Sequence, residues 1–235
     1  MKKVILFVAA VFVAFSSFAG GNGVKALKKK GEGVLSNGFY LNLGLAFPSA
    51  ISTINFNGGN FTGSSQNLGL QPSLEIGNQW YFWHNKRFGV GLKVSWFQFG
   101  YSVPQISSSN YSSVATNYTN NDLDIRLLKV APQISFGITK ELAIDLSFEV
   151  SPTLNLNIVY FKDANALDNV LSNYNYGALF APGIRFRYRV FAAGFDYSLG
   201  TLNYKGTTEI NNVKQPDVNG TSTFALPRIY LGFQF

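Results

Sequence analysis

Residues 223–235 read TFALPRIYLGFQF, and their side chains alternate between the two faces of an extended chain. One face carries Thr223, Ala225, Pro227, Ile229, Leu231, Phe233 and Phe235, and the other carries Leu226, Arg228, Tyr230, Gly232 and Gln234. Alternation with a period of two predicts a β-strand that is apolar on one side only. Such a strand ends on an aromatic residue only where something buries that residue. A lipid bilayer would bury Phe235.

Seven stretches upstream alternate in the same way. They span residues 39–47, 68–79, 88–96, 123–136, 142–150, 180–187 and 191–198. In the fourth stretch the apolar face changes parity, which predicts a bulge near Leu127 and Leu128. Because an open sheet would leave unpaired backbone edges in hydrocarbon, the eight strands must close. The sequence therefore predicts an all-β fold, an eight-stranded antiparallel up-and-down transmembrane β-barrel over residues 37–235.

The connections between these strands alternate in length. Short turns are expected at residues 84–87, 139–141 and 189–190, and long loops rich in Ser, Asn, Gly and Thr at 49–65, 102–122, 162–173 and 205–222. In barrels of this kind the short turns face the periplasm and the long loops face the outside. Aromatic residues near both ends of the strands predict the two girdles that lie at the membrane interfaces.

The amino terminus predicts export. Lys2 and Lys3 precede an apolar stretch at residues 4–15 and small residues before Gly20, which is typical of a signal peptide cleaved after Ala19. We therefore expect a signal peptide at 1–19, a basic periplasmic leader at 20–36 and localisation in the bacterial outer membrane. The leader's lysines are expected to form a solvated tail, with anionic head groups or a periplasmic partner as the alternative.

Composition fits the membrane prediction. Sixteen per cent of the residues are aromatic and only thirteen per cent are charged, which is unusual for a soluble domain. The chain has no cysteine, so we expect neither disulfides nor a lipid-modified cysteine. The formal net charge of +7 lies largely in the signal peptide and the leader. The remaining charge is too weak and dispersed to predict nucleic-acid binding.

From Asn37 to Phe235 the chain resembles the small eight-stranded outer-membrane proteins of the OmpA transmembrane-domain and OmpX type. The likeness is one of topology and of the final strand. It implies that Leu231, Phe233 and Phe235 form the assembly signal read by the barrel-assembly machinery. It also implies a protein in contact with outer-membrane lipid, which we expect to be a monomer. The family's roles are diverse and include adhesion, envelope integrity and lipid A modification.

One phrase recurs in every strand that leads back to a turn. It begins at Pro72, Pro132, Pro182 and Pro227, and each proline is followed two residues later by Leu or Ile. Proline inside a strand forfeits a ladder hydrogen bond. A bulge at each copy would absorb the loss.

The inward faces carry charges that we name the lumen network. Its residues are Glu75, Lys93, Lys129, Asp145, Glu149, Arg185, Arg187, Asp196 and Arg228. Folding the hairpins about their turns places Glu75 diagonal to Lys93, Lys129 opposite Glu149, and Arg185 close to Asp196. The structural interpretation is a lumen filled by paired side chains, which is the default for eight strands. The functional interpretation is a gated, narrow pore.

We expect no catalytic, cofactor-binding or metal-binding residue. His84 is the only histidine and falls in a predicted turn. The catalytic histidine of a hydrolase works best in a cleft that excludes water, and a turn offers no such cleft. A metal site is not expected, because the sequence has no cysteine and no second histidine to act as ligands. The sequence therefore favours a non-enzymatic barrel with a structural or surface-interaction role, in which a surface ligand would contact loops rich in Tyr, Asn and Ser. The alternatives are a narrow small-solute channel and an accessory subunit of an envelope export machine.

Overall fold

The computed structural model describes residues 34–56, 59–62, 66–67, 69–102, 105–109, 116–162, 168–210, 213–214 and 217–235. The strands are β1 (Gly38–Ala46), β2 (Ser49–Phe56), β3 (Gly59–Thr62), β4 (Gln66–Asn67), β5 (Gln71–His84), β6 (Phe88–Tyr101), β7 (Gln105–Ser109), β8 (Thr116–Gly137), β9 (Leu142–Lys162), β10 (Asp168–Tyr188), β11 (Phe191–Ile210), β12 (Val213–Lys214) and β13 (Val218–Gln234). Within these ranges, no helix has the length and apolar character needed to cross a membrane.

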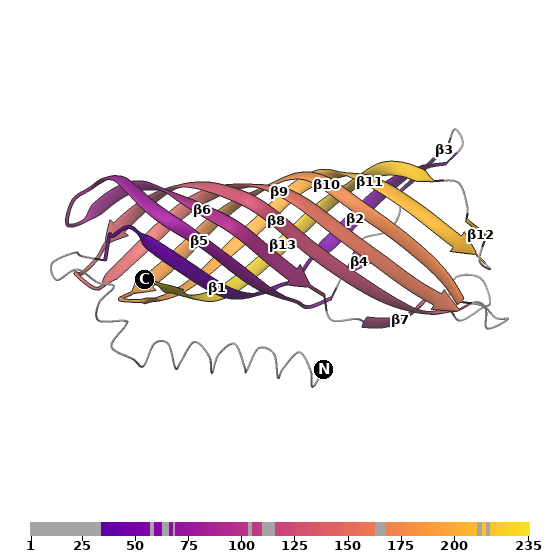
Figure 1. Ribbon diagram of the computed structural model, residues 1–235, viewed down its shortest axis with the longest axis horizontal. Helices are drawn as coiled ribbons and strands as arrows, with labels where there is room; N and C mark the ends of the chain where they lie inside the picture. Colours follow the sequence, from indigo (N-terminus) through magenta and orange to yellow (C-terminus); the bar gives the residue numbers. More distant parts are fainter. Residues whose placement is uncertain are drawn as a thin grey trace.

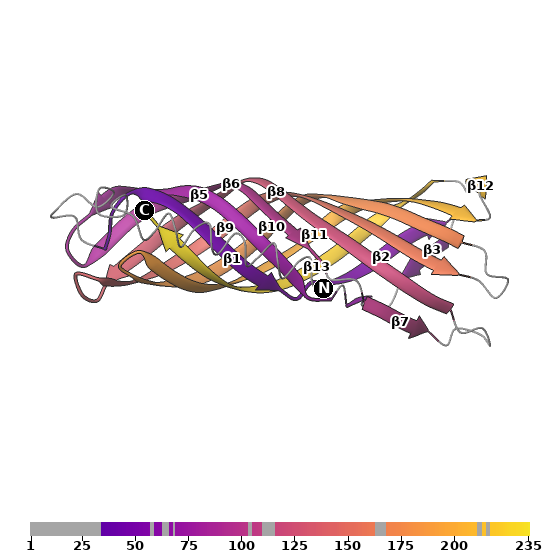
Figure 2. The ribbon, with the colours of Figure 1, turned by 60° about the horizontal axis from the view of Figure 1, so that its bottom comes forward.

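The sheet closes into a barrel (Figures 1 and 2). Around the ring the order is β1, β5, β6, β8, β9, β10, β11 and β13, and β13 pairs with both β11 and β1. β2 lies end to end with β1 along the same neighbour, so nine strands occupy eight positions. The break between β1 and β2 falls at Phe47 and Pro48, where Phe47 N still donates to Pro227 O at 2.9 Å. The predicted eight-stranded antiparallel barrel is confirmed.

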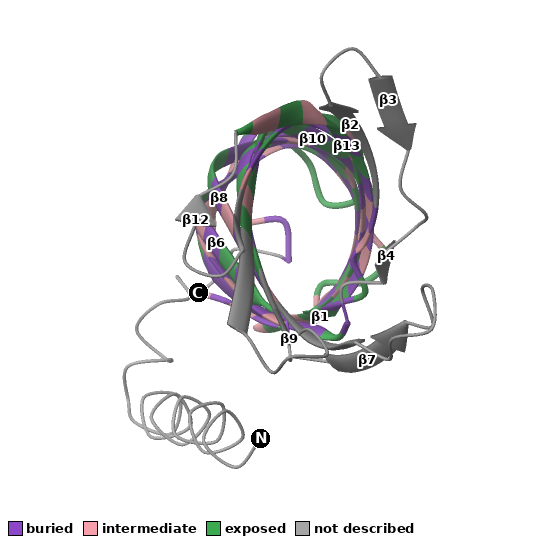
Figure 3. Cartoon of the chain, turned by 90° about the vertical axis from the view of Figure 1, so that its right-hand side faces the viewer, coloured by how far each residue is buried: buried purple, intermediate pink, exposed green. Residues whose placement is uncertain are grey.

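The barrel is polar inside and apolar outside. Figure 3 views it end on, with buried and exposed residues alternating along its strands. Leu146, Phe148 and Phe180 are among many large apolar side chains that are exposed on the outer wall, whereas Glu75 and Lys93 are buried inside. A protein in water would bury these apolar side chains. A closed barrel with this outer surface suits hydrocarbon.

The predicted bulge in β8 is confirmed. The register between β8 and β9 shifts between Arg126 and Val130, and Leu128 adopts a φ of 53°. A positive φ is uncommon for a bulky residue, so the local ladder must hold it in place. Leu127 and Leu128 consequently both lie exposed on the outer wall. Arg126 and Lys129 both lie buried inside, on either side of the bulge.

The strands extend further at the loop end than the sequence predicts. Parts of the four expected loops lie in strands: 49–56 in β2, 116–122 in β8, 168–173 in β10, and 205–210 and 218–222 in β11 and β13. The predicted loop boundaries are therefore wrong at these places. The prediction depended on apolar alternation, whereas a backbone ladder continues wherever two extended chains can pair.

The four recurrent prolines do not cause bulges. They pair in unbroken register with the preceding neighbour in the ring: Pro72 with Leu45, Pro132 with Leu92, Pro182 with Phe148 and Pro227 with Tyr197. Towards the following neighbour the ladder omits each proline. The expected bulges at these positions are thus wrong. The missing N–H affects one flank only, and the strand stays paired on the other.

Candidate functional site

Five charges meet in the middle of the lumen. Glu75 of β5 lies 3.2 Å from Lys129 Nζ, 2.6 Å from Arg228 Nη2 and 3.8 Å from Lys93 Nζ. Glu149 of β9 lies 2.5 Å from Lys93 Nζ and 2.6 Å from Lys129 Nζ. Two carboxylates and two ammonium groups therefore alternate in a closed arrangement, and a guanidinium extends it. Each of these five buried charges therefore has at least one partner of opposite charge.

Neutral side chains complete the environment of Glu75. Tyr40 Oη donates to its Oε1 at 3.1 Å, and Asn42 Nδ2 donates to its Oε2 at 3.3 Å. Lys129 Nζ also donates to Gln98 Oε1 at 2.8 Å. Tyr40 was not among the site residues predicted from the sequence. Its inward parity in the first strand was a signal, because tyrosine on a lumen face needs a polar partner for its hydroxyl.

A second group of charges lies nearer the turns. Asp145 of β9 accepts from Arg185 Nε at 2.8 Å and from Arg187 Nε at 2.6 Å. Arg187 Nη2 also donates to Tyr81 Oη at 2.6 Å, and Arg185 Nη2 donates to Gln79 Oε1. Gln79 and Tyr81 stand on β5, opposite β10 in the ring. These two arginines therefore reach across the full width of the lumen.

The structure places all nine lumen-network residues inside the barrel, each at most 3% exposed. Lys129 contacts Glu149 as predicted. Lys93 comes within salt-bridge distance of Glu75, but not from the diagonal position that folding the hairpin predicts. The third predicted pair is wrong. Asp196 stands opposite Gly183 and pairs with Arg228 at 2.5 Å, whereas Arg185 pairs with Asp145.

Two irregularities explain why hairpin folding misplaced Glu75 relative to Lys93. Register shifts between β5 and β6 fall at Ile76–Gly77 and at Tyr81–Trp83. Glu75 consequently stands opposite Gln98, and Lys93 stands opposite Gln79. Glu75 and Lys93 are not diagonal neighbours in the hairpin. They meet because both long side chains point into one narrow lumen.

The lumen also holds an ion pair whose two residues were not predicted from the sequence. Arg126 lies 2.9 Å from Asp124 and donates to Ser198 Oγ at 2.7 Å. Both charged residues stand on β8 above the bulge, where the parity is opposite to that below it. The predicted bulge implies that Asp124 and Arg126 face inward, so the sequence did contain a signal for this pair.

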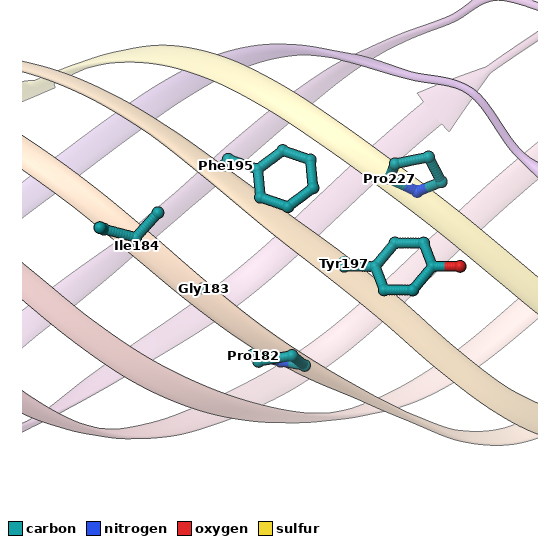
Figure 4. A pocket seen from close by; sticks show the side chains of 6 residues that line it. All are labelled: Pro182, Gly183, Ile184, Phe195, Tyr197 and Pro227. Carbon is teal, nitrogen blue, oxygen red and sulfur yellow. The ribbon is translucent and has the colours of Figure 1, made fainter.

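An open apolar groove of about 570 Å³ lies on the outer wall (Figure 4). It is lined by Pro182, Gly183, Ile184, Phe195, Tyr197 and Pro227. Two of the recurrent prolines, Pro182 and Pro227, thus stand on the strands that flank β11. The lining suits hydrocarbon, and its one ionisable side chain is that of Tyr197.

His84 stands at the turn end of the barrel. This residue is exposed at the end of β5, and its ring lies 5.9 Å from that of Tyr81. Within the described ranges, no cluster of three or more histidine, cysteine or acidic residues could hold a metal ion. At the same end, a hydrogen bond from Arg189 to Glu141 at 2.9 Å raises the pKa of the arginine.

The geometry identifies a membrane barrel. The ring is closed, its lumen is charged, and its outer wall is apolar. The protein has the fold of a bacterial outer-membrane β-barrel. Its outer wall lies in the lipid of the outer membrane.

Solved structures of the same class are similar to the chain. The outer membrane protease OmpT from Escherichia coli is 8% identical, with a TM-score of 0.49 over 86% of this chain and 99% of that one. A major outer membrane protein from Thermus thermophilus is 11% identical, with a TM-score of 0.49 over 85% and 100%. The attachment invasion locus protein Ail of Yersinia pestis is 10% identical, with a TM-score of 0.33 over 83% and 99%. No family model and no curated protein matches the chain.

At such identities and scores these likenesses carry no argument about activity. The fold assignment rests on the closed ring itself, in which β13 pairs with both β11 and β1. The function must be argued from the lumen and the two ends of the barrel.

Proposed function

We propose that the protein is a closed, non-enzymatic barrel that sits in the outer membrane and presents its long loops as an extracellular interaction surface. The observation that carries this proposal is the pair of cross-lumen contacts from β10 to β5. Arg187 reaches Tyr81 and Arg185 reaches Gln79, although the two strands stand on opposite sides of the ring. Side chains that meet across the diameter leave no continuous water path at that level.

The rest of the lumen supports closure. Above the central charges, Ala50, Leu179, Leu202 and Phe224 form a buried apolar cluster. Beyond it a chain of hydrogen bonds runs from Asn175 to Asn155, at 3.1 Å, and from Asn155 to Asp122, at 2.7 Å. Side chains therefore fill the interior at several levels, as the strand number favours.

The loop end supports a surface role. Tyr174 and Tyr176 are exposed on β10 with their rings 6.1 Å apart, and the strand begins six residues before Tyr174. At ~3.3 Å per residue, this part of the wall rises about 20 Å along the strand beyond the tyrosines. Tyrosine commonly lies at the membrane interface. The projecting wall would present the loops to a ligand clear of the lipid head groups.

Planar-bilayer recording on refolded protein tests the closed lumen. We expect no unitary current steps from the parent chain. The matched variant combines Arg185→Ser with Arg187→Ser, which removes both cross-lumen contacts. It should also give no steps if the rest of the filled lumen closes the barrel, and steps from this variant alone would assign the closure to the two arginines. Reproducible unitary steps from the parent would overturn closure and favour the narrow small-solute channel, whose charged lining is the lumen network.

Two finer expectations belong to the same proposal. The barrel is proposed to be a monomer, which sedimentation in detergent can test by giving the mass of one chain and one micelle. Its final strand is proposed to be read by the barrel-assembly machinery. The two pairings of β13, with β1 and with β11, support that reading because this strand completes the ring.

A further inference from the structure

The segment that precedes β1 begins inside the barrel, at Val34 and Leu35. Val34 and Leu35 are only 3% and 4% exposed, and they cluster with Tyr81 of β5 and Ala143 of β9. β1 starts at Gly38. The chain therefore enters the turn-side mouth of the lumen before it joins the wall.

Three groups of the wall hold this segment. Arg187 Nη1 donates to Val34 O at 2.5 Å, and Gln234 Nε2 donates to Ser36 O at 3.1 Å. The backbone N–H of Tyr81 donates to Asn37 Oδ1 at 2.6 Å. The donors come from β10, β13 and β5, so the segment is held from three sides of the ring.

These contacts are more specific than those of a solvated tail. A buried guanidinium and a buried amide both donate to carbonyl oxygens of the segment, and two aliphatic side chains fill the space between them. Buried donors need acceptors, and buried carbonyls need donors. The donors at the mouth and the carbonyl acceptors of the segment therefore satisfy each other's hydrogen bonds.

We propose that the turn-side mouth is a binding site for the chain's own residues 34–37, and that this segment is a releasable plug. The ligand class is a short peptide with two adjacent aliphatic side chains. This inference goes beyond the proposed function, because a barrel closed by its lumen network needs no second closure.

Release is local because the segment has few attachments. It forms three hydrogen bonds and one small apolar cluster, whereas the adjoining strand is paired on both sides by β5 and β13. Segments with few contacts open at a much lower free-energy cost than the whole fold. Arg187 also binds Asp145, so withdrawal of Val34 changes the hydrogen bonding of a lumen-network residue.

Thiol labelling tests the plug, because the chain has no cysteine. Ala143→Cys places a single thiol beneath the plug at a position that is fully buried. Folded protein is treated with a membrane-impermeant maleimide in the parent background and in Val34→Ser combined with Leu35→Ser. We expect labelling to be at least roughly tenfold faster with the two serines, since the lost apolar contacts shift the plug towards release.

Two controls define the result. Lys140→Cys in the exposed turn should label rapidly in both backgrounds, and Ile138→Ser outside the mouth should leave the labelling of Ala143→Cys slow. Retention of the β-sheet circular dichroism spectrum shows that each variant has folded. Rapid labelling of Ala143→Cys in the parent, or equally slow labelling with and without the two serines, would overturn the plug.

Discussion

Lys129 Nζ lies 2.6 Å from Glu149 Oε2, although a bulge interrupts the ladder between their two strands next to the pair. Leu128, the residue at positive φ, directly precedes the lysine. The bulge turns Leu128 outward and lets Lys129 point inward. An irregularity of the backbone therefore delivers this charge to the lumen.

Replacing Lys129 should destabilise the barrel in a way that depends on Glu149. Lys129→Met leaves Glu149 with Lys93 as its remaining cationic contact. The loss should therefore fall below the ~3 to 5 kcal/mol expected when a buried charge loses its sole partner. With Glu149→Gln added, the combined loss should be smaller than the sum of the two single losses by ~0.5 to 3 kcal/mol. Urea unfolding in micelles measures each free energy.

A matched control separates contact from general damage. Asp145→Asn alters the second group of charges, in which this carboxylate binds Arg185 and Arg187. Its loss should add to that of Lys129→Met. Additivity of Lys129→Met with Glu149→Gln as well would show that the 2.6 Å contact is not energetically coupled.

The sequence predicted which residues face the lumen more completely than it predicted how they pair. The side of the wall on which a residue lies depends on alternation along its own strand. Because this period is local, the inward assignment is correct for all nine lumen-network residues. Pairing depends on register across strands. The shifts at Ile76–Gly77 and Tyr81–Trp83 carry no sequence signal that we could identify, and they move Glu75 opposite Gln98.

Contacts across the ring were beyond prediction for a different reason. Arg187 and Tyr81 are 106 residues apart and meet only after the barrel has closed. Their contact depends on the diameter and stagger of the whole ring. The plug at Val34 could not be predicted for the same reason. Two adjacent apolar residues, Val34 and Leu35, do not distinguish a segment bound in the lumen from an ordinary linker.

Gly194 should not tolerate a methyl group. A Cβ at this inward position of β11 would overlap the Tyr230 ring and lie 2.9 Å from Ile184 O. The ring is buried and the carbonyl belongs to the wall, so neither yields easily. Gly194→Ala should cost ~1 to 3 kcal/mol of unfolding free energy. Gly183→Ala is the control, because its nearest contact would be Ser147 Oγ at 3.1 Å and the cost should be smaller. Equal costs in urea unfolding would contradict this packing.

Surface labelling should distinguish the two ends of the barrel. The turn at Asn85 lies at the same end as those at Thr139 and Arg189, opposite the loop end. A tag inserted at Asn85 should stay unlabelled on intact cells, whereas tags near Asn110 or Asn212 should be labelled. The latter two sites lie outside the described residues and rest on the order of the strands. Labelling at Asn85 alone would reverse the assigned orientation.

Deleting Phe235 should impair assembly in cells more than it impairs stability in micelles. Phe235 N donates to Phe39 O at 2.8 Å, Phe39 N donates to Phe235 O at 3.1 Å, and the two rings lie 6.3 Å apart. Two backbone hydrogen bonds and one ring contact amount to a loss of ~1.5 to 4.5 kcal/mol in refolded protein. If the residue is also an assembly signal, the yield of folded barrel in the outer membrane should fall further than that loss explains.

Point variants at the same position separate the signal from the closure of the ring. Phe235→Ala keeps the two backbone hydrogen bonds and removes only the ring. Its unfolding free energy should therefore fall by ~0.5 to 1.5 kcal/mol for the lost ring contact, in addition to the cost of the apolar area lost. Its assembly in cells should nevertheless resemble that of the deletion, because a recognition signal depends on the aromatic side chain. Phe235→Tyr should restore both. If assembly followed measured stability across all three variants, the residue would act only by closing β13 against β1.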